Sequence, residues 1–148
     1  MSLTEQLNAA MKEAMKAKDS LRLGAIRLIR SAIQNREIEE KGALDDQAVI
    51  GVLSTLAKQR RDSIDAFRDS GRTDLAEKEQ RELEVIQEFL PQQLDEAQIE
   101  AIIEEAVAQT GAESPRDMGK VMKIVVPRTT GRADGRLVSE KVKERLSR

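Results

Sequence analysis

The basic side chains in the last third of the chain have the clearest potential for chemistry. Residues 114–148 carry ten Lys and Arg against four Asp and Glu, a net charge of +6. Some of these cations recur one helical turn apart, and others punctuate the loop between two expected helices. The candidate contact residues are Arg116, Lys120, Lys123, Arg128, Arg132, Arg136, Lys141 and Arg145. Such a surface suits a run of phosphates, so the pattern predicts a nucleic-acid interface that reads backbone shape rather than base sequence.

The alternative for the same cations is a solvated surface that neighbouring acids neutralise. Residues 91–113 hold six Asp and Glu and no Lys or Arg. The helix expected in this acidic segment directly precedes the basic helices in the sequence. Composition and charge alone leave both interpretations open.

The remaining side chains offer little to an enzyme. The chain has no Cys and no His, which excludes thiolate and imidazole nucleophiles, metal ligands and acid–base groups. Acidic clusters such as Glu37, Glu39 and Glu40 have the spacing of solvated helix faces, and Gly119-Lys120 lacks the other residues of a phosphate-binding loop. We therefore predict no catalytic residue, no metal site and no cofactor. With two Phe and no Trp or Tyr, base stacking is also nearly excluded.

Arg60 interrupts the apolar stripe of a long expected helix. A turn signal follows at residues 70–74, and the next helix carries Glu79 and Glu82 at a similar distance beyond that turn. If the two helices fold back as an antiparallel hairpin, Arg60 or Arg61 comes level with these two acids. We expect a structural ion pair there rather than a ligand site.

Helices must position all these residues, because apolar residues recur at helical spacing along nearly the whole chain. The pattern predicts an all-α protein with two helical domains, residues 1–90 and residues 91–148. The first contains four helices, of which the last two form the long antiparallel hairpin. Expected helix N-caps in this domain are Ser2, Asp19 and Asp45 or Asp46.

The second domain is predicted to be a compact bundle of three helices. Ser114-Pro115 is a start signal for the middle helix, and Pro127 is expected to end it. A loop at residues 128–135 then leads to the last helix. The strand-like run at residues 124–126 is too short to build a sheet.

The sequence also suggests a location. The first residues lack a basic stretch followed by an apolar one, and no apolar run approaches the ~20 residues of a membrane span. The absence of Cys is compatible with a reducing compartment. We therefore expect a cytoplasmic protein without a membrane partner, whose oligomeric state the sequence leaves open.

Several segments resemble the signature of the YqeY family, which includes the GatB/YqeY tail domain. The most specific segments lie in the last third, from Asp117 to Lys123, at Pro127-Arg128 and from Gly131 to Gly135. Further agreement covers residues 23–35, 58–63 and 88–94. The resemblance extends over essentially the whole chain, with Val126 where the family more often has methionine.

This resemblance implies an all-α, two-domain bacterial protein. Its C-terminal half is similar to the tail of the B subunit of the tRNA-dependent amidotransferases, which convert glutamyl or aspartyl groups on misacylated tRNA to the amides. In those enzymes the tail domain contacts tRNA, while other domains carry the chemistry. The resemblance thus implies tRNA as a partner, with the aminoacyl-tRNA or amidotransferase machinery as possible further partners. The label that comes with the family is a carbon–nitrogen ligase with glutamine as amido-N-donor.

Three functions follow from the residues and the resemblance together. The first is a tRNA-binding accessory protein without catalysis of its own, which the basic last third favours. The second is a participant in glutamine-dependent tRNA amidation, which the family label alone favours. The third is a protein–protein adaptor with no role in RNA binding, in which the long hairpin docks onto another subunit.

Overall fold

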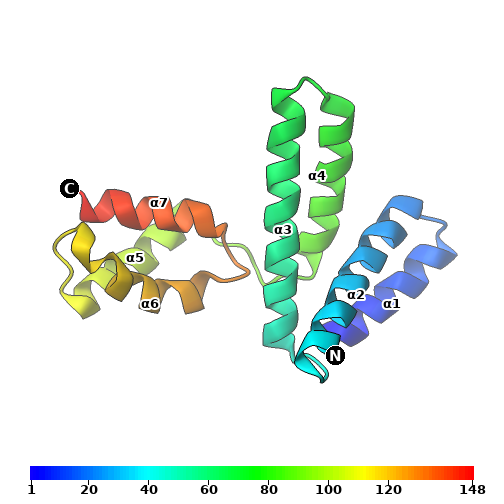
Figure 1. The fold of residues 1–148 in the computed structure, drawn as a ribbon, viewed down its shortest axis with the longest axis horizontal. Coiled ribbons are helices and arrows are strands. Elements are labelled where there is room, and N and C mark those ends of the chain that lie inside the picture. Colours follow the sequence, from blue (N-terminus) through cyan, green and yellow to red (C-terminus); the bar gives the residue numbers. More distant parts are fainter. The chain divides into compact units, whose positions relative to one another are not determined.

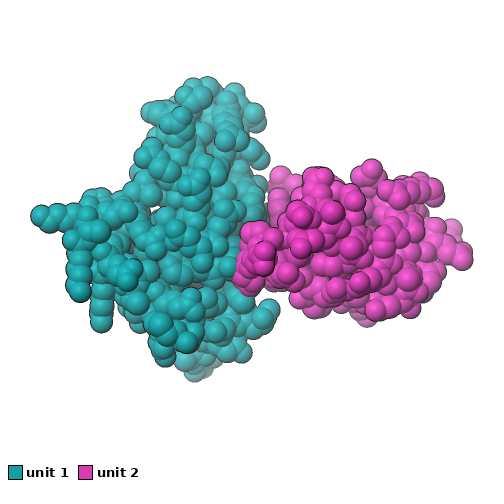
Figure 2. All heavy atoms as spheres, turned by 180° about the vertical axis from the view of Figure 1, so that it is seen from behind, with its two compact units in different colours: residues 1–90 teal, residues 91–148 magenta.

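The chain folds entirely into helices, which confirms the all-α prediction. The computed structural model describes residues 1–148 and contains seven α-helices, one short 3₁₀ helix and no strand (Figure 1). Contacts between residues divide the chain into two compact units, Met1–Leu90 and Pro91–Arg148 (Figure 2). Each unit has its own apolar core.

Unit 1 consists of four α-helices, whose starts follow from local capping chemistry. The side chains of Ser2, Asp19 and Asp45 accept hydrogen bonds from backbone N–H groups in the first turns of α1, α2 and α3. These bonds satisfy N–H groups that have no partner within the helix. The helices are α1 (Leu3–Lys16), α2 (Ser20–Glu40), α3 (Asp46–Asp69) and α4 (Thr73–Glu88).

The third and fourth helices form a long antiparallel hairpin, which is the most extensive helix contact of the unit. The turn between them contains Gly71 at φ +78°, a conformation that glycine adopts without steric penalty. Leu53 and Ile64 on α3 and Leu83 and Ile86 on α4 are buried in the core of the unit. The hairpin packs against α2. The chain reverses at residues 17–19, so that α1 packs along α2 as well.

Unit 2 is a bundle of three helices around α6. Its elements are α5 (Glu96–Thr110), a 3₁₀ helix η1 (Pro115–Asp117), α6 (Met118–Thr129) and α7 (Gly135–Leu146). The α6 helix packs against both α5 and α7 more extensively than these two pack against each other. Fully buried Val121 and Val125 of α6 meet Ile99 and Ile103 of α5 and Val138 of α7 in one core.

Both ends of α6 differ from the expectation. Ser114-Pro115 opens the short η1 turn, which then runs into α6 at Met118. Pro127 does not end the helix, which continues to Thr129. A proline in the last turn removes only one backbone hydrogen bond, and here its ring is exposed to solvent. The buried Thr129 hydroxyl donates to the Val125 carbonyl at 3.0 Å and holds the final turn closed.

The segment before α5 is tied to the loop that follows α6. The backbone N–H of Leu94 donates to the carbonyl of Arg132 at 2.8 Å, and the Gln93 side chain donates to the carbonyl of Gly131 at 2.8 Å. Gly131 itself is buried and has φ +76°, which favours glycine at this position. These bonds hold the first residues of unit 2 against the loop between α6 and α7.

Candidate nucleic-acid interface

One face of α6 is apolar and buried in the core of unit 2, and the opposite face is basic and exposed to solvent. Val121 and Val125, one turn apart, are fully buried against α5 and α7. Arg116 in η1 and Lys120 and Lys123 in α6 follow the same helical period on the other side, where all three are exposed. We call the exposed residues Arg116, Gly119, Lys120, Lys123 and Val126 the α6 basic face.

The cations of this face are available to a ligand. Arg116 and Lys123 form no ion pair within the chain, and the side chain of Lys120 is 70% exposed. The only acid near Lys120 is Asp117, whose carboxylate lies 3.8 Å from the ammonium group, at the limit of an ion pair. Exposed contacts of this length contribute little to stability, so they leave the lysine free to turn toward an anion.

Two cations of α7, Lys141 and Arg145, face the acidic helix α5 instead. Lys141 Nζ lies 3.1 Å from a Glu100 oxygen and 3.7 Å from a Glu96 oxygen. One turn later, Arg145 hydrogen-bonds and pairs with Glu104. These hydrogen bonds raise the pKa of Lys141 and lower the pKa of the Glu104 carboxyl. The acids of α5 therefore neutralise two of the three predicted contact residues on α7.

The remaining predicted cations lie around the loop between α6 and α7. Arg128 hydrogen-bonds and pairs with Glu105 of α5, so the last turn of α6 is also neutralised. The Arg132 side chain is half-buried and donates to the carbonyl of Gln92 at 3.4 Å. Arg136 is exposed in the first turn of α7. The eight predicted residues thus do not form one surface. Arg128, Lys141 and Arg145 pair with acids of α5, whereas the cations of the α6 basic face have no partner there.

Asp117 is a residue of this site that the sequence reasoning missed. Its carboxylate accepts hydrogen bonds from the backbone N–H groups of Glu113 at 2.9 Å and Ser114 at 3.4 Å. The bond from Glu113 contributes most to lowering the pKa of the Asp117 carboxyl. The spacing of Ser114 and Asp117 is that of a capping box, which is the signal that could have identified this role. Asp117 fixes the turn that presents Arg116 and Lys120.

A second polar constellation lies inside the α3–α4 hairpin. Arg60 Nε is 3.2 Å from Glu79 Oε2 and 3.0 Å from Glu82 Oε2, and the three side chains are only 18%, 21% and 15% exposed. Arg61 forms no such pair. The cluster therefore places one guanidinium between two carboxylates that are largely shielded from solvent. This is the arrangement of a structural ion pair rather than of a ligand site.

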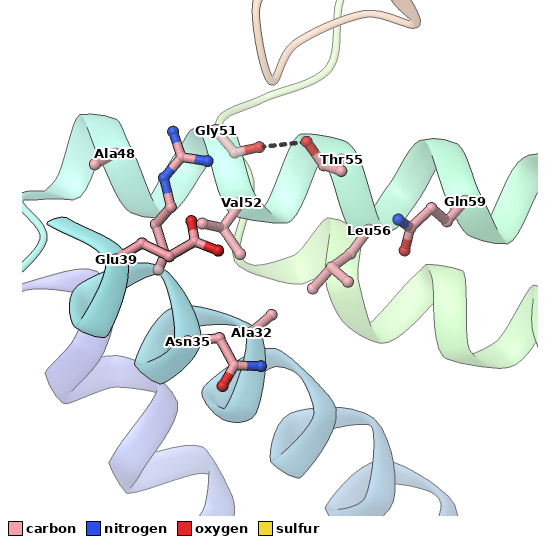
Figure 3. A pocket seen from close by; sticks show the side chains of 10 residues that line it. Ala32, Asn35, Glu39, Ala48, Gly51, Val52, Thr55, Leu56 and Gln59 are labelled. Carbon is pink, nitrogen blue, oxygen red and sulfur yellow. Dashed lines mark hydrogen bonds between the residues drawn. The ribbon is translucent and has the colours of Figure 1, made fainter.

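A groove of about 520 Å³ opens between α2 and α3 in unit 1 (Figure 3). Its floor consists of Ala32 from α2 and Val52 and Leu56 from α3, while Asn35 and Gln59 supply amides at its walls. Gly51 also lines the groove, and an added Cβ there would meet no atom within 4 Å, so the backbone at this position borders open space.

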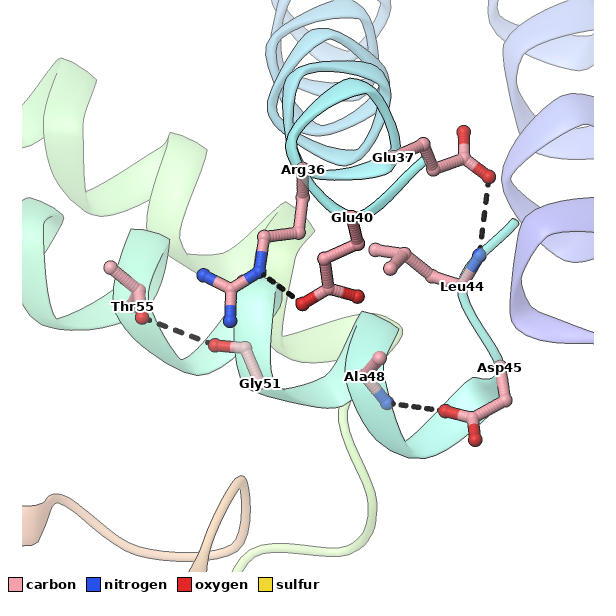
Figure 4. A network of polar contacts seen from close by, with 8 residues as sticks. All are labelled: Arg36, Glu37, Glu40, Leu44, Asp45, Ala48, Gly51 and Thr55. Carbon is pink, nitrogen blue, oxygen red and sulfur yellow. Dashed lines mark hydrogen bonds and ion pairs between the residues drawn. The ribbon is translucent and has the colours of Figure 1, made fainter. Parts of the chain in front are cut away.

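Hydrogen bonds at the end of α2 hold this groove in shape (Figure 4). Arg36 Nε donates to Glu40 at 2.9 Å, and Glu37 accepts from the backbone N–H of Leu44 at 3.2 Å. Asp45 then caps α3 by accepting from the N–H of Ala48 at 2.8 Å. Arg36 is therefore engaged, whereas Glu39 on the groove wall has no ion-pair partner.

Two further features of the molecule bear on function. The structure brings no group of three acidic side chains together in an arrangement that would hold a metal ion. None of its helices has both the length and the apolar character needed to cross a membrane.

Comparison with curated proteins finds relatives in yeasts that carry the name "Altered inheritance of mitochondria protein 41, mitochondrial". The protein of Lachancea thermotolerans is 38% identical over 112 residues, covering 74% of this chain and 60% of the relative. That of Vanderwaltozyma polyspora is 35% identical over 120 residues, covering 76% and 64%. That of Saccharomyces cerevisiae strain YJM789 is 41% identical over 87 residues, covering 58% and 47%. The chain thus spans between about half and two thirds of the length of these relatives.

These names correct one expectation from the sequence. The relatives are mitochondrial proteins of yeasts, so the prediction of a bacterial, cytoplasmic protein is wrong. The family resemblance is confirmed, because the family model described as "Yqey-like protein" matches residues 4–146, nearly the whole chain and both of its units. The chain therefore belongs to the Yqey-like family.

Proposed function

We propose that this protein is a tRNA-binding accessory protein that contacts the RNA backbone through the α6 basic face. The observation that carries the proposal is the set of exposed cations on this face, Arg116, Lys120 and Lys123, which no acid of α5 neutralises. Exposed, mobile cations of this kind bind phosphates by releasing counterions, without reading base sequence.

The geometry also sets the expected salt dependence of binding. Three available cations correspond to about three phosphate contacts, so the log–log slope of affinity against salt is expected to be about −2 to −3. The larger number of contacts that the sequence predicts would require Arg128, Lys141 and Arg145 as well. Those three side chains are held by acids of α5 and contribute little.

Charge reversal on the face tests the proposal. The double variant Lys120→Glu, Lys123→Glu is expected to bind bulk tRNA more weakly and to flatten the salt slope by about 2, because two phosphate contacts are lost. The matched control is Lys12→Glu, Lys16→Glu in α1, where both lysines are equally exposed. Filter binding at several salt concentrations gives both quantities. Equal binding by the two double variants, or no salt-dependent binding by the wild type, contradicts the proposal.

The two compact units support a division into two domains, 1–90 and 91–148, with the RNA contact in the second. The unit boundary falls at Leu90–Pro91, and each unit buries its own apolar residues. In this arrangement unit 2 corresponds to the tail domain that the family resemblance implies.

A second candidate, the adaptor function, is favoured by the groove between α2 and α3. Its apolar floor, the bare backbone at Gly51 and the unpaired Glu39 suit an amphipathic helix of a partner protein that carries a basic residue opposite Glu39. A photo-crosslinking residue at Thr55, on the groove wall, would identify the partner. The purified partner should then lose binding to Gly51→Leu, which fills the groove, and keep binding to the Lys120→Glu, Lys123→Glu variant.

A further inference from the structure

We infer that the α6 basic face binds double-stranded RNA across its minor groove, with Gly119 as the point of closest backbone approach. The inference rests on the proposed function, because it names the form of RNA that the same face contacts. It goes beyond that proposal in excluding single strands and DNA duplexes as equal ligands.

Single-stranded RNA fits this face poorly. Proteins hold single strands by stacking unpaired bases on aromatic side chains, in addition to phosphate contacts. The chain has only two aromatic residues, Phe67 and Phe89, and both belong to unit 1. The α6 basic face offers Val126, 44% exposed, as its only large apolar side chain. It therefore lacks any platform for a base.

The shape of the face fits the minor groove of an RNA duplex. The major groove of A-form RNA is deep and narrow, whereas its minor groove is wide and shallow and displays the 2′-hydroxyls. The backbone of a helix comes closest to such a surface where its side chains are smallest. Gly119 provides such a point within the face, three residues after Arg116 and directly before Lys120.

The glycine has no packing role inside the protein. A Cβ at residue 119 would meet no atom within 4 Å, so no neighbour requires its absence. Gly119 is the second residue of α6, and its φ does not lie in the left-handed region that favours glycine, so the local backbone does not require a glycine either. Its missing side chain leaves the backbone exposed beside Lys120 and Lys123, the cations that would contact the phosphates.

Three probes of one sequence test the form of nucleic acid. Fluorescence anisotropy would compare a 20-base-pair RNA duplex, the DNA duplex of the same sequence and one of the RNA strands alone, with bulk tRNA as reference. We expect the RNA duplex to bind at least about tenfold more tightly than either of the other two. If tRNA binds but the DNA duplex or the single strand equals the RNA duplex, this inference fails and the proposed function stands. If tRNA itself does not bind, the proposed function fails as well.

Substitution of the glycine tests the close approach. Gly119→Leu is expected to weaken binding to the RNA duplex about tenfold without changing the salt slope, because no phosphate contact is removed. Gly24→Leu is the matched control, since Gly24 is also an exposed helical glycine whose Cβ would meet nothing within 4 Å. Gly119→Ala, which favours the helix, is expected to bind about threefold more weakly, so a folding defect cannot explain the loss. Wild-type affinity in both Gly119 variants would overturn the role of the glycine.

Discussion

At the scale of single residues, the Arg60 cluster has one cation for two largely buried carboxylates. Glu79 and Glu82 share this one guanidinium inside the α3–α4 hairpin, at 3.2 and 3.0 Å. Replacing Arg60 by Ala would leave two carboxylates close together and largely shielded from water. We expect Arg60→Ala to lower the free energy of unfolding by about 1–3 kcal/mol, as measured by urea denaturation.

The neighbouring arginine provides the control for this prediction. Arg61 has the same charge and lies on the same helix, but it forms no ion pair with the acids of α4. Arg61→Ala is therefore expected to change the unfolding free energy by less than about 0.5 kcal/mol. Equal losses in the two variants would show that the charge of α3, and not the pairing of Arg60, stabilises the hairpin.

Two carboxyl groups of unit 2 make its stability depend on pH. A hydrogen bond from Arg145 lowers the pKa of Glu104 below its ordinary value of 4.5, and backbone N–H groups lower the pKa of Asp117 below 3.8. Because the folded pKa values are the lower ones, this stabilisation is present above the unfolded values and is lost as pH falls through the folded values. We expect Asp117→Asn to lower the unfolding free energy at pH 7, and this deficit to shrink as the pH falls below the ordinary value of 3.8. A deficit that stays constant as the pH falls would show a loss of hydrogen bonding or packing rather than of charge.

At the scale of helices, the groove between α2 and α3 leads to a stability prediction. Gly51 lies in the interior of α3, and a Cβ there would meet no atom within 4 Å. Gly51→Ala should therefore raise the unfolding free energy by about 0.5–1 kcal/mol, the usual gain of alanine over glycine in a helix. Thermal unfolding followed by circular dichroism would measure it. A loss of stability would mean that the bare backbone at this position is needed by the fold itself.

The helices also show which features a sequence can predict. The N-caps Ser2, Asp19 and Asp45 bond to backbone groups within one helical turn, so the sequence alone predicts them. The prediction that Pro127 ends α6 is wrong, because the proline lies in the last turn and the helix continues to the buried Thr129. The burial of Thr129 results from tertiary packing, which the local sequence does not show. Helical spacing placed Lys141 and Arg145 on one face of α7. It could not show that this face meets the acids of α5, since that requires the register of two helices that are far apart in sequence.

At the scale of the whole molecule, the basic last third and the acidic segment before it belong to one folded unit. The six acids of residues 91–113 are adjacent in sequence to the ten cations of residues 114–148. When the unit folds, some of these opposite charges form ion pairs, which link α5 to α7 and to the end of α6. The three cations of the α6 basic face are among those that have no partner on α5. The positive charge that unit 2 leaves unpaired is therefore set by its packing and is smaller than its composition suggests.

The division into two units predicts where a protease cuts first. Gln92 and Gln93 are exposed and lie outside any helix, just after the boundary between the units. The sequence predicts a loop at residues 128–135. In the structure, however, Thr129 and Gly131 are buried, and Gly131 accepts a hydrogen bond from Gln93. We expect a brief digestion of the full chain with proteinase K to cut at residues 91–93 and to spare residues 129–131. Mass spectrometry of the fragments would locate the cuts. Early cleavage inside α6 or at residues 129–131 would show that the hydrogen bonds from Gln93 and Leu94 do not protect this part of unit 2.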